Sequence, residues 1–346
     1  MHRPEESLLL KIIKAIIGFT ISIVFLWLSL KDVRWVEVKQ SFQAMNYFYI
    51  IPVCLAIFAA NYFRAIRWRY MLVHIKRIPV RSLFEIIMIS NLLLNVLPAR
   101  IGDVIRAYLI GRKYNISKMA SFSTVVIERV FDGIFTIMLF VLVLWLVAGG
   151  RMAMVPGGTD SYVTKAIVTV CIIFTGALGA LLLMHFFPDR VLAVVRTAMR
   201  PFPEKFSGRV DSLARLFIQG LGVFGNMKNL LAAILITVIE WNLVNLSNYL
   251  CLLGFGIGKE FLFSFILLGF IIIAVMIPAA PGFVGTYHYA VQLCLVKFYD
   301  VSSSVGMSYA WVTWFCSLAV NATLGFIYYN KYHLTLDAIK NIDSGE

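Results

Sequence analysis

The sequence has little charge, and it lacks the cysteine patterns that hold small secreted domains or zinc sites together. Only 14% of its 346 residues are charged, whereas an ordinary soluble domain carries about 25%. The 5 cysteines stand singly in or beside apolar segments, without a CxxC pair, which disfavours a disulfide or zinc scaffold. A GxxxxGK[ST] loop and the HExxH and GxSxG motifs are also missing. We therefore expect no metal, no cofactor and no ATP-driven pumping by this chain.

The sequence is instead rich in hydrophobic residues and carries a positive net charge. Hydrophobic residues make up 60% of the chain, and the formal net charge is +13. In a soluble protein this charge would suggest nucleic acid, but in membrane proteins Lys and Arg gather in cytoplasmic loops. We therefore predict an integral membrane protein without a nucleic-acid partner.

Six apolar segments are long enough to cross the bilayer, which takes about 20 residues for roughly 30 Å of hydrocarbon. They are residues 8–30, 47–68, 120–148, 163–187, 229–252 and 303–329. The first is too long for a signal-peptide core and has no small-residue cleavage site, so we expect it to remain as a membrane helix. The predicted fold is an all-α polytopic membrane protein, with residues 1–346 in a single membrane domain.

Two further apolar stretches, 83–112 and 261–298, are broken by residues that cannot continue a helix. The breaks contain Pro98 and Gly102 in the first stretch and Pro278, Pro281, Gly282 and Gly285 in the second. We predict two re-entrant helical hairpins, each of which enters and leaves the membrane on one side. Irregular backbone at that depth is tolerated only inside protein or beside a water-filled cavity.

The basic residues predict the orientation of the chain. If the six spans alternate and each hairpin returns to its own side, both termini lie on one side, together with 23 of the 31 Lys and Arg residues. The side richer in Lys and Arg is cytoplasmic. We therefore predict cytoplasmic N- and C-termini.

The two breaks also indicate an internal repeat. The pattern Pro98-Ala99-x-x-Gly102-x-Val104 recurs 180 residues later as Pro278-Ala279-x-x-Gly282-x-Val284. The order span, hairpin, span then repeats in residues 47–148 and 229–330, joined by a connecting span and linker in 149–228. Because the hairpins open to opposite sides, we predict an inverted repeat, which is typical of transporters.

The connecting segment 189–227 is polar and basic. Val210, Leu213, Phe217 and Leu221 stand at helical spacing within it. This pattern predicts an amphipathic helix that lies at the cytoplasmic membrane interface.

Several charges stand where hydrocarbon is expected. They are Arg100, Asp103 and Arg106 in the first hairpin and Glu128, Arg129 and Asp132 in the span 120–148. Each central charge costs about 2.5–3.5 kcal/mol when it faces lipid, so these side chains must face each other, water or a ligand. Two compatible interpretations follow: a salt-bridge network that holds the hairpin, and a docking site for a zwitterionic lipid headgroup.

Other polar side chains in the apolar segments have weaker interpretations. Glu240 is a candidate for proton exchange, and His288 in the second hairpin is a candidate for titration near neutral pH. Asn242, Asn245 and Asn248 form a polar strip near Glu240, and they bond helix to helix in the simplest interpretation. The same interpretation applies to four more asparagines: Asn61, Asn91, Asn95 and Asn321.

The ordered motifs resemble the transmembrane region of lysylphosphatidylglycerol synthases, the flippase part of the multiple peptide resistance factor. The resemblance covers about residues 47–329 and lies in three patterns: Pro98-x-Arg100-x-Gly102-Asp103-x-x-Arg106, Glu128-Arg129-x-x-Asp132-Gly133 and Pro278-x-x-Pro281-Gly282-x-x-Gly285. It implies a polytopic inner-membrane protein that moves aminoacylated or otherwise modified lipids between leaflets.

The sequence departs from the family pattern at three positions. Asp103 stands where the family usually has Glu, Ala99 replaces the usual Gly, and His288 stands where relatives commonly carry an acid. The last change puts the charge of the cargo in doubt. The chain ends at Glu346 without the soluble aminoacyl-transfer domain, so we do not expect it to synthesise lysylphosphatidylglycerol.

These observations leave three functional hypotheses. In the first, a lipid flippase moves a phospholipid or other modified lipid through a groove formed by both hairpins and the spans 120–148 and 229–252. In the second, a membrane-embedded enzyme modifies a lipid with Asp103, Glu128 and Asp132 as acid, base or cation ligands. In the third, the chain is an accessory subunit that binds a separate lipid synthase through its basic surface at 190–215.

Overall fold

The structure is a computed structural model of the whole chain, and it describes residues 8–96, 102–147, 162–258, 260–276 and 280–332. Every regular element in these ranges is a helix, which confirms the all-α prediction for this part of the chain. The α-helices are α1 (Leu8–Leu30), α2 (Trp35–Ala44), α3 (Ile50–Leu72), α4 (Val80–Val96), α5 (Gly102–Tyr114), α6 (Lys118–Val147), α7 (Tyr162–Phe186), α8 (Pro188–Met199), α9 (Glu204–Gly220), α10 (Met227–Gly254), α11 (Ser264–Met276), α12 (Thr286–Phe298) and α13 (Ser303–Lys331). The short 3-10 helices are η1 (Tyr47–Tyr49), η5 (Leu221–Gly225), η6 (Phe261–Phe263) and η7 (Pro281–Phe283).

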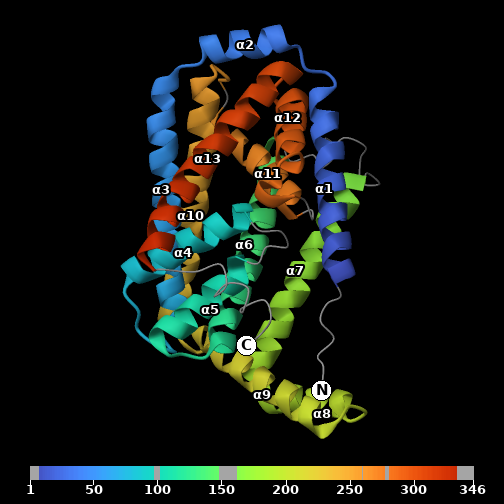
Figure 1. Cartoon of the computed structure of the whole chain (residues 1–346), viewed down its shortest axis with the longest axis vertical. Coiled ribbons are helices and arrows are strands. Elements are labelled where there is room, and N and C mark those ends of the chain that lie inside the picture. Colours follow the sequence, from blue (N-terminus) through green and yellow to red (C-terminus); the bar gives the residue numbers. More distant parts are fainter. Residues whose placement is uncertain (1–7, 97–101, 148–161, 259, 277–279, 333–346) are drawn as a thin grey trace.

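Each of the six predicted spans coincides with one long helix (Figure 1). By length and composition, three helical stretches of the described residues can cross a membrane: Tyr47–Leu72, Met227–Gly254 and Ser303–Lys331. A fourth candidate is the pair Thr175–Phe186 and Pro188–Met199, which is bent by 106°. The chain is thus a helical membrane protein, and its total of six full spans stays a prediction.

The helices α3 and α10 form an antiparallel pair through the length of the protein. At one end, the backbone N–H of Asn46 before α3 donates to the carbonyl oxygen of Gly254 at 2.9 Å. At the other end, His74 after α3 lies against Gly222 in η5, just before α10 begins. This pair provides the frame against which both hairpins pack.

The two helices of the first predicted hairpin are α4 and α5, and its entry and exit on one side of the membrane stay a prediction. The Ser90 hydroxyl on α4 donates to the carbonyl oxygen of Gly102 at 2.9 Å. A Cβ on Gly102 would lie 2.5 Å from the carbonyl oxygen of Ser90, so a glycine is needed where α5 begins against α4. The other break residue of this stretch, Pro98, lies outside the described residues.

The two helices of the second predicted hairpin are α11 and α12, with η7 just before α12, and its re-entrant course also stays a prediction. Gly282 and Gly285 have φ angles of 71° and 92°, which residues with a side chain rarely adopt. A Cβ on Gly285 would also lie 2.2 Å from the carbonyl oxygen of Ser22, so the glycine allows α1 to approach. Pro281 begins η7, and Pro278 lies outside the described residues.

The inner ends of the two hairpins meet. A Cβ on Gly282 would lie 3.7 Å from the carbonyl oxygen of Asn95, near the end of α4. The indole N–H of Trp314 on α13 donates to the carbonyl oxygen of Gly282 at 2.7 Å. The helix α13, which follows the second hairpin, thus holds its tip at η7, and the end of α4 lies beside the same point.

The helices fall into two groups in chain order, α3 to α6 and α10 to α13. The helix contacts follow the same scheme in both groups. The second arm of each hairpin packs on the long helix that follows it, α5 on α6 and α12 on α13. The first arm packs on the final helix of the other group, α4 on α13 and α11 on α6. Each hairpin is therefore enclosed between helices of both groups.

The connecting segment contains two helices where the sequence analysis expected one. The helices α8 and α9 lie at the lower end of the molecule in Figure 1, separated at Pro201 and Pro203. Prolines disfavour continuation of a helix, which explains the division. Asp211 on α9 binds Arg196 on α8 at 2.8 Å, so the two helices are linked by an exposed ion pair.

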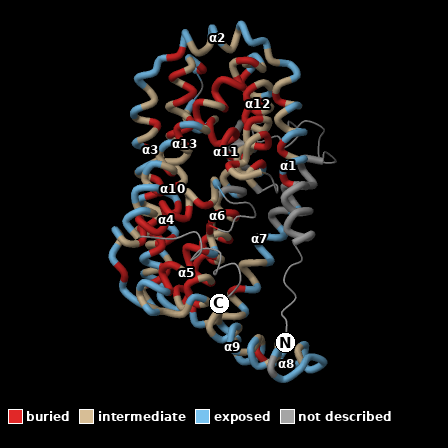
Figure 2. Tube along the Cα trace, viewed as in Figure 1, coloured by how far each residue is buried: buried red, intermediate tan, exposed pale blue. Residues whose placement is uncertain are grey.

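The buried residues form two apolar clusters, coloured red in Figure 2. One is centred on α4, α5 and the first half of α6. The other is centred on α11, α12 and α13. The site described below lies where the helices α3 and α10 pass from one cluster to the other.

Candidate functional site

A buried network of opposite charges joins α3, α5, α6 and α10. Its members are four arginines, Arg64, Arg67, Arg106 and Arg129, and four acidic residues, Asp103, Glu128, Asp132 and Glu240. The set carries no net charge when every member is ionised. Mutual pairing of this kind lowers the cost of holding charges at membrane depth.

Arg67 is the centre of the network. Its side chain is fully buried and contacts three carboxylates: Asp132 at 2.5 Å, Glu128 at 3.0 Å and Glu240 at 3.2 Å. The contact with Asp132 is bidentate, since a second guanidinium nitrogen donates to the other carboxylate oxygen at 3.2 Å. A planar guanidinium suits this arrangement better than an ammonium group would.

Two further arginines extend the network toward α5. Arg106 binds Glu128 at 3.2 Å, and its guanidinium carbon lies 4.8 Å from the centre of the Trp68 ring. Arg129 binds Asp103 at 2.9 Å and lies 3.6 Å from Asp132. The Arg129 side chain is 42% exposed, so the network reaches the protein surface at this edge.

At the opposite edge, Arg64 connects the network to a cavity. Its Nε donates to Glu240 at 2.7 Å, and its side chain is 18% exposed. Glu240 is fully buried between Arg64 and Arg67. The indole N–H of Trp241, the next residue on α10, donates to Asp132 at 3.2 Å.

The structure brings together five of the six charges that the sequence analysis selected. Asp103, Arg106, Glu128, Arg129 and Asp132 all belong to the network, and Arg100 lies outside the described residues. Their pairing agrees with the salt-bridge interpretation. Headgroup binding by this set stays a prediction.

Sequence reasoning missed Arg64 and Arg67. Both were counted among the cytoplasmic charges, which is wrong for Arg67 because its side chain is enclosed in the helix bundle. A signal was present: two arginines three residues apart stand in the second half of an apolar helix and face one side of it. Glu240 also required a cationic partner at that depth.

A cavity of about 290 Å³ with a mixed apolar and polar lining lies where the two hairpins meet. Among the described residues, its lining comes from α3, α4, α10, α11, η7, α12 and α13, and none comes from α6. The groove between both hairpins and the spans 120–148 and 229–252 stays a prediction, and this cavity differs from it in that α3 and α13 contribute to the lining and α6 does not. The reason is that α6 faces the charge network instead.

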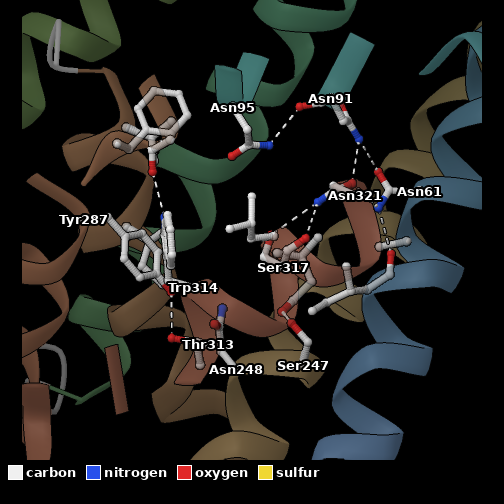
Figure 3. A pocket seen from close by; sticks show the side chains of 18 of the residues that line it. Asn61, Asn91, Asn95, Ser247, Asn248, Tyr287, Thr313, Trp314, Ser317 and Asn321 are labelled. Carbon is white, nitrogen blue, oxygen red and sulfur yellow. Dashed lines mark hydrogen bonds between the residues drawn. The ribbon is translucent and has the colours of Figure 1, made fainter. Parts of the chain in front are cut away.

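Three asparagines from three helices form hydrogen bonds at one wall of this cavity (Figure 3). The Asn91 carboxamide on α4 donates to Asn61 on α3 and to Asn321 on α13, at 2.9 Å each. Asn61 donates to Asn321 at 3.3 Å. The predicted packing role of these residues is confirmed, and in addition they line the cavity together with Asn95.

The remaining polar residues singled out from the sequence lie at different places in the helix bundle. Asn245 donates to the Ser264 hydroxyl at 2.7 Å, and Asn242 donates to its own helix at the Val238 carbonyl. Asn248 lines the cavity. The His288 ring lies 4.1 Å from the Trp311 ring, and neither ring nitrogen has a partner among the described residues.

The chemistry available at the site is ionic pairing and hydrogen bonding. Within the described ranges, no group of three His, Cys, Asp or Glu side chains is arranged to hold a metal ion. The carboxylates proposed as acid, base or cation ligands, Asp103, Glu128 and Asp132, each contact an arginine. The cavity beside them offers amides, hydroxyls and one guanidinium.

Comparisons with known proteins agree with a membrane role. The family model described as "Lysylphosphatidylglycerol synthase TM region" matches residues 15–325. The chain is also 26% identical to the glycosyltransferase AglD of Haloferax volcanii over 241 residues, which cover 62% of this chain. The match spans 38% of that relative's length. No solved structure matches the chain.

Proposed function

Because the chain belongs to the lysylphosphatidylglycerol synthase transmembrane-region family, we propose that it moves a lipid with a polar headgroup between the two membrane leaflets. The observation that carries this proposal is the cavity, with its wall of asparagines, at the junction of the two broken hairpins. Broken helices that meet around a site near the midplane are typical of transporters. The lipid leaves the protein chemically unchanged.

The arrangement of the hairpins supports alternating access. We propose that residues 47–148 and 229–330 form an inverted repeat, joined by 149–228. In support, α4 packs on α13 as α11 packs on α6, and α3 packs antiparallel to α10. In such a repeat, an exchange of conformations between the halves moves the opening of the site from one side to the other.

The headgroup binds on the Arg64 side of the cavity, while the acyl chains stay in lipid. Arg64 is the charged residue among those that line the cavity, and a guanidinium binds phosphate through paired hydrogen bonds. The charge network behind it holds Arg64 through Glu240 and fixes α5 and α6 against α3. Protonation of Glu240 would release Arg64, which offers a route to proton coupling.

The placement of basic residues supports a prokaryotic inner-membrane protein with cytoplasmic termini. The helices α8 and α9 carry exposed arginines, including Arg190, Arg196 and Arg209, at one end of the bundle. The positive-inside rule puts this end in the cytoplasm. A separate lipid synthase is the partner that would supply the modified lipid on this side.

Lipid movement in proteoliposomes tests the proposal. Phosphatidylglycerol with a fluorescent acyl chain is added in trace amounts, and dithionite then destroys the label in the outer leaflet. With the full chain reconstituted, we expect the label of the inner leaflet to become accessible much faster than in protein-free vesicles. Equal rates would overturn the proposed function.

A double variant tests the site. Arg64→Gln with Glu240→Gln removes one cation and one anion together, so the charge balance of the network is retained. We expect it to slow movement by about tenfold or more, as the loss of one charged hydrogen bond predicts. Arg69→Gln, an exposed position on the same helix, should leave the rate unchanged. An unaltered rate in a folded double variant would contradict the assignment of Arg64.

A further inference from the structure

Apolar side chains make up most of the cavity lining, and a group of neutral hydrogen-bonding residues stands among them. Five carboxamides and three serine or threonine hydroxyl groups line it, in addition to Arg64: Asn61, Asn91, Asn95, Asn248, Asn321, Ser247, Thr313 and Ser317 (Figure 3). Carboxamides donate and accept at the same position, as hydroxyl groups of a ligand also do. The cavity therefore matches a partner that carries several hydroxyl groups.

Part of this hydrogen-bonding capacity is not used inside the protein. Asn248 is 6% exposed, and its carboxamide has no hydrogen-bond partner among the described residues. Asn95 uses its amide nitrogen for the Asn91 carbonyl at 2.8 Å, and its side-chain oxygen has no partner in the described part of the chain. A polar group held in this way inside a protein favours a ligand or water that completes its bonds.

Aromatic rings close the opposite wall. Trp314 and Tyr287 both line the cavity, and their polar atoms are already bound, by Gly282 and Thr313 respectively. What they offer to a ligand is therefore mainly the apolar ring surface. A ring-shaped or extended polyol has C–H surfaces that can pack there, while its hydroxyl groups face the asparagines.

The charges favour an anionic over a cationic headgroup. Arg64 lines the cavity, and the described lining residues include no Asp, Glu or Lys. The neighbouring carboxylate, Glu240, is already bound by Arg64 and Arg67. An ammonium group in the cavity would thus lack a carboxylate partner, and a buried unpaired charge is costly.

We propose that the cavity binds a hydroxyl-rich, phosphate-linked headgroup, such as a lipid phosphodiester of a polyol or sugar, with the phosphate at Arg64 and the hydroxyl groups at Asn248, Asn95 and Asn91. A volume of about 290 Å³ is at the small end of ligand sites, which are about 300–1,000 Å³. It accommodates one headgroup unit. This inference rests on the proposed lipid transport and specifies its substrate class.

A lipid panel tests the substrate class. The full chain in proteoliposomes is given phosphatidylinositol, phosphatidylglycerol, lysyl-phosphatidylglycerol and an uncharged glycosyl diacylglycerol, each with a fluorescent acyl chain. We expect the two anionic polyol lipids to move at least about tenfold faster than the lysyl ester, and the uncharged glycolipid to move more slowly than phosphatidylinositol. Equal rates for all four lipids, or fastest movement of the lysyl ester, would overturn the inference while the proposed transport stands. Absence of movement for all four would overturn the proposed transport.

Direct binding gives a readout that does not depend on transport. In native mass spectrometry of the purified chain with an equimolar lipid mixture, phosphatidylinositol should be retained over lysyl-phosphatidylglycerol. Asn248→Leu and, as a second variant, Asn95→Leu should reduce this retention by about tenfold, the effect of one lost hydrogen bond to a polar ligand. Asn242→Leu is the matched control, because Asn242 lies on the same helix and binds the Val238 carbonyl. Retention that is unchanged in both test variants, or lowered equally by the control, would overturn the inference.

Discussion

The removal of Arg67 is the sharpest test of the buried network. Its guanidinium contacts Asp132, Glu128 and Glu240 at 2.5–3.2 Å, and none of its side-chain surface is exposed. The substitution Arg67→Gln keeps a long polar side chain but removes the charge. The network would then hold three arginines and four carboxylates.

The expected cost follows from the geometry. At about 3 Å and an effective dielectric constant of about 20, one pair of charges attracts by about 5 kcal/mol, and desolvation offsets much of this. The three carboxylates retain other partners, namely Arg129, Arg106 and Arg64. We therefore expect a loss of about 3–5 kcal/mol in the free energy of unfolding, the range for removal of one member of a buried ion pair.

Unfolding in mixed micelles, followed by circular dichroism as the denaturing detergent is increased, measures this loss. Arg69→Gln, two residues away and exposed, should change stability by no more than about 0.5 kcal/mol. Addition of Asp132→Asn to Arg67→Gln should recover part of the loss, since it removes an uncompensated charge. An Arg67→Gln protein as stable as the Arg69→Gln control would refute the account of the network.

Three further predictions concern a glycine at a helix contact, a buried glutamate on α4 and the ion pair between α8 and α9. Gly285→Ala should destabilise the protein by about 2–4 kcal/mol in thermal unfolding, because a Cβ there meets α1 and φ is 92°. The control is Gly208→Ala, which has open space around its Cβ. It should stabilise the protein by about 0.5–1 kcal/mol in the same assay. Glu85→Gln should cost about 1–3 kcal/mol in the same assay, since Glu85 is buried and binds a lysine at the end of α13 at 2.6 Å; an unchanged midpoint would contradict this. Hydrogen bonds from Arg196 and a second arginine on α9 lower the pKa of Asp211, so the link between α8 and α9 is present above about pH 4 and is lost as the pH falls through that lowered pKa. Spin-label distances between the two helices should therefore broaden only in acid, and broadening at neutral pH would contradict the assignment.

Much of the fold could be predicted because the membrane restricts what an apolar segment can do. Runs of about 20 apolar residues form helices in lipid, and prolines and glycines interrupt them. The helix breaks near Gly102 and Gly282 were therefore predictable. The division of the connecting segment at Pro201 and Pro203 was predictable by the same rule, but its amphipathic spacing led to one helix in place of two.

The candidate site was only partly predictable. Charges in an apolar segment stand out in a sequence, and the cost of exposing them to lipid required Asp103, Arg106 and Glu128 to find partners. The asparagines of the cavity carry no such signal, since single amides in membrane helices commonly bond helix to helix. Asn61, Asn91 and Asn321 are brought to one point by tertiary packing of α3, α4 and α13, which no local pattern encodes.

The most direct test follows the leaflet and the mass of the same lipid in one experiment. Proteoliposomes with the full chain are given labelled phosphatidylglycerol in the outer leaflet, and both its accessibility to dithionite and its mass are recorded over time. The account predicts that the lipid becomes protected in the inner leaflet while its mass stays constant. A lipid of new mass, or a leaflet distribution equal to that of protein-free vesicles, would contradict it.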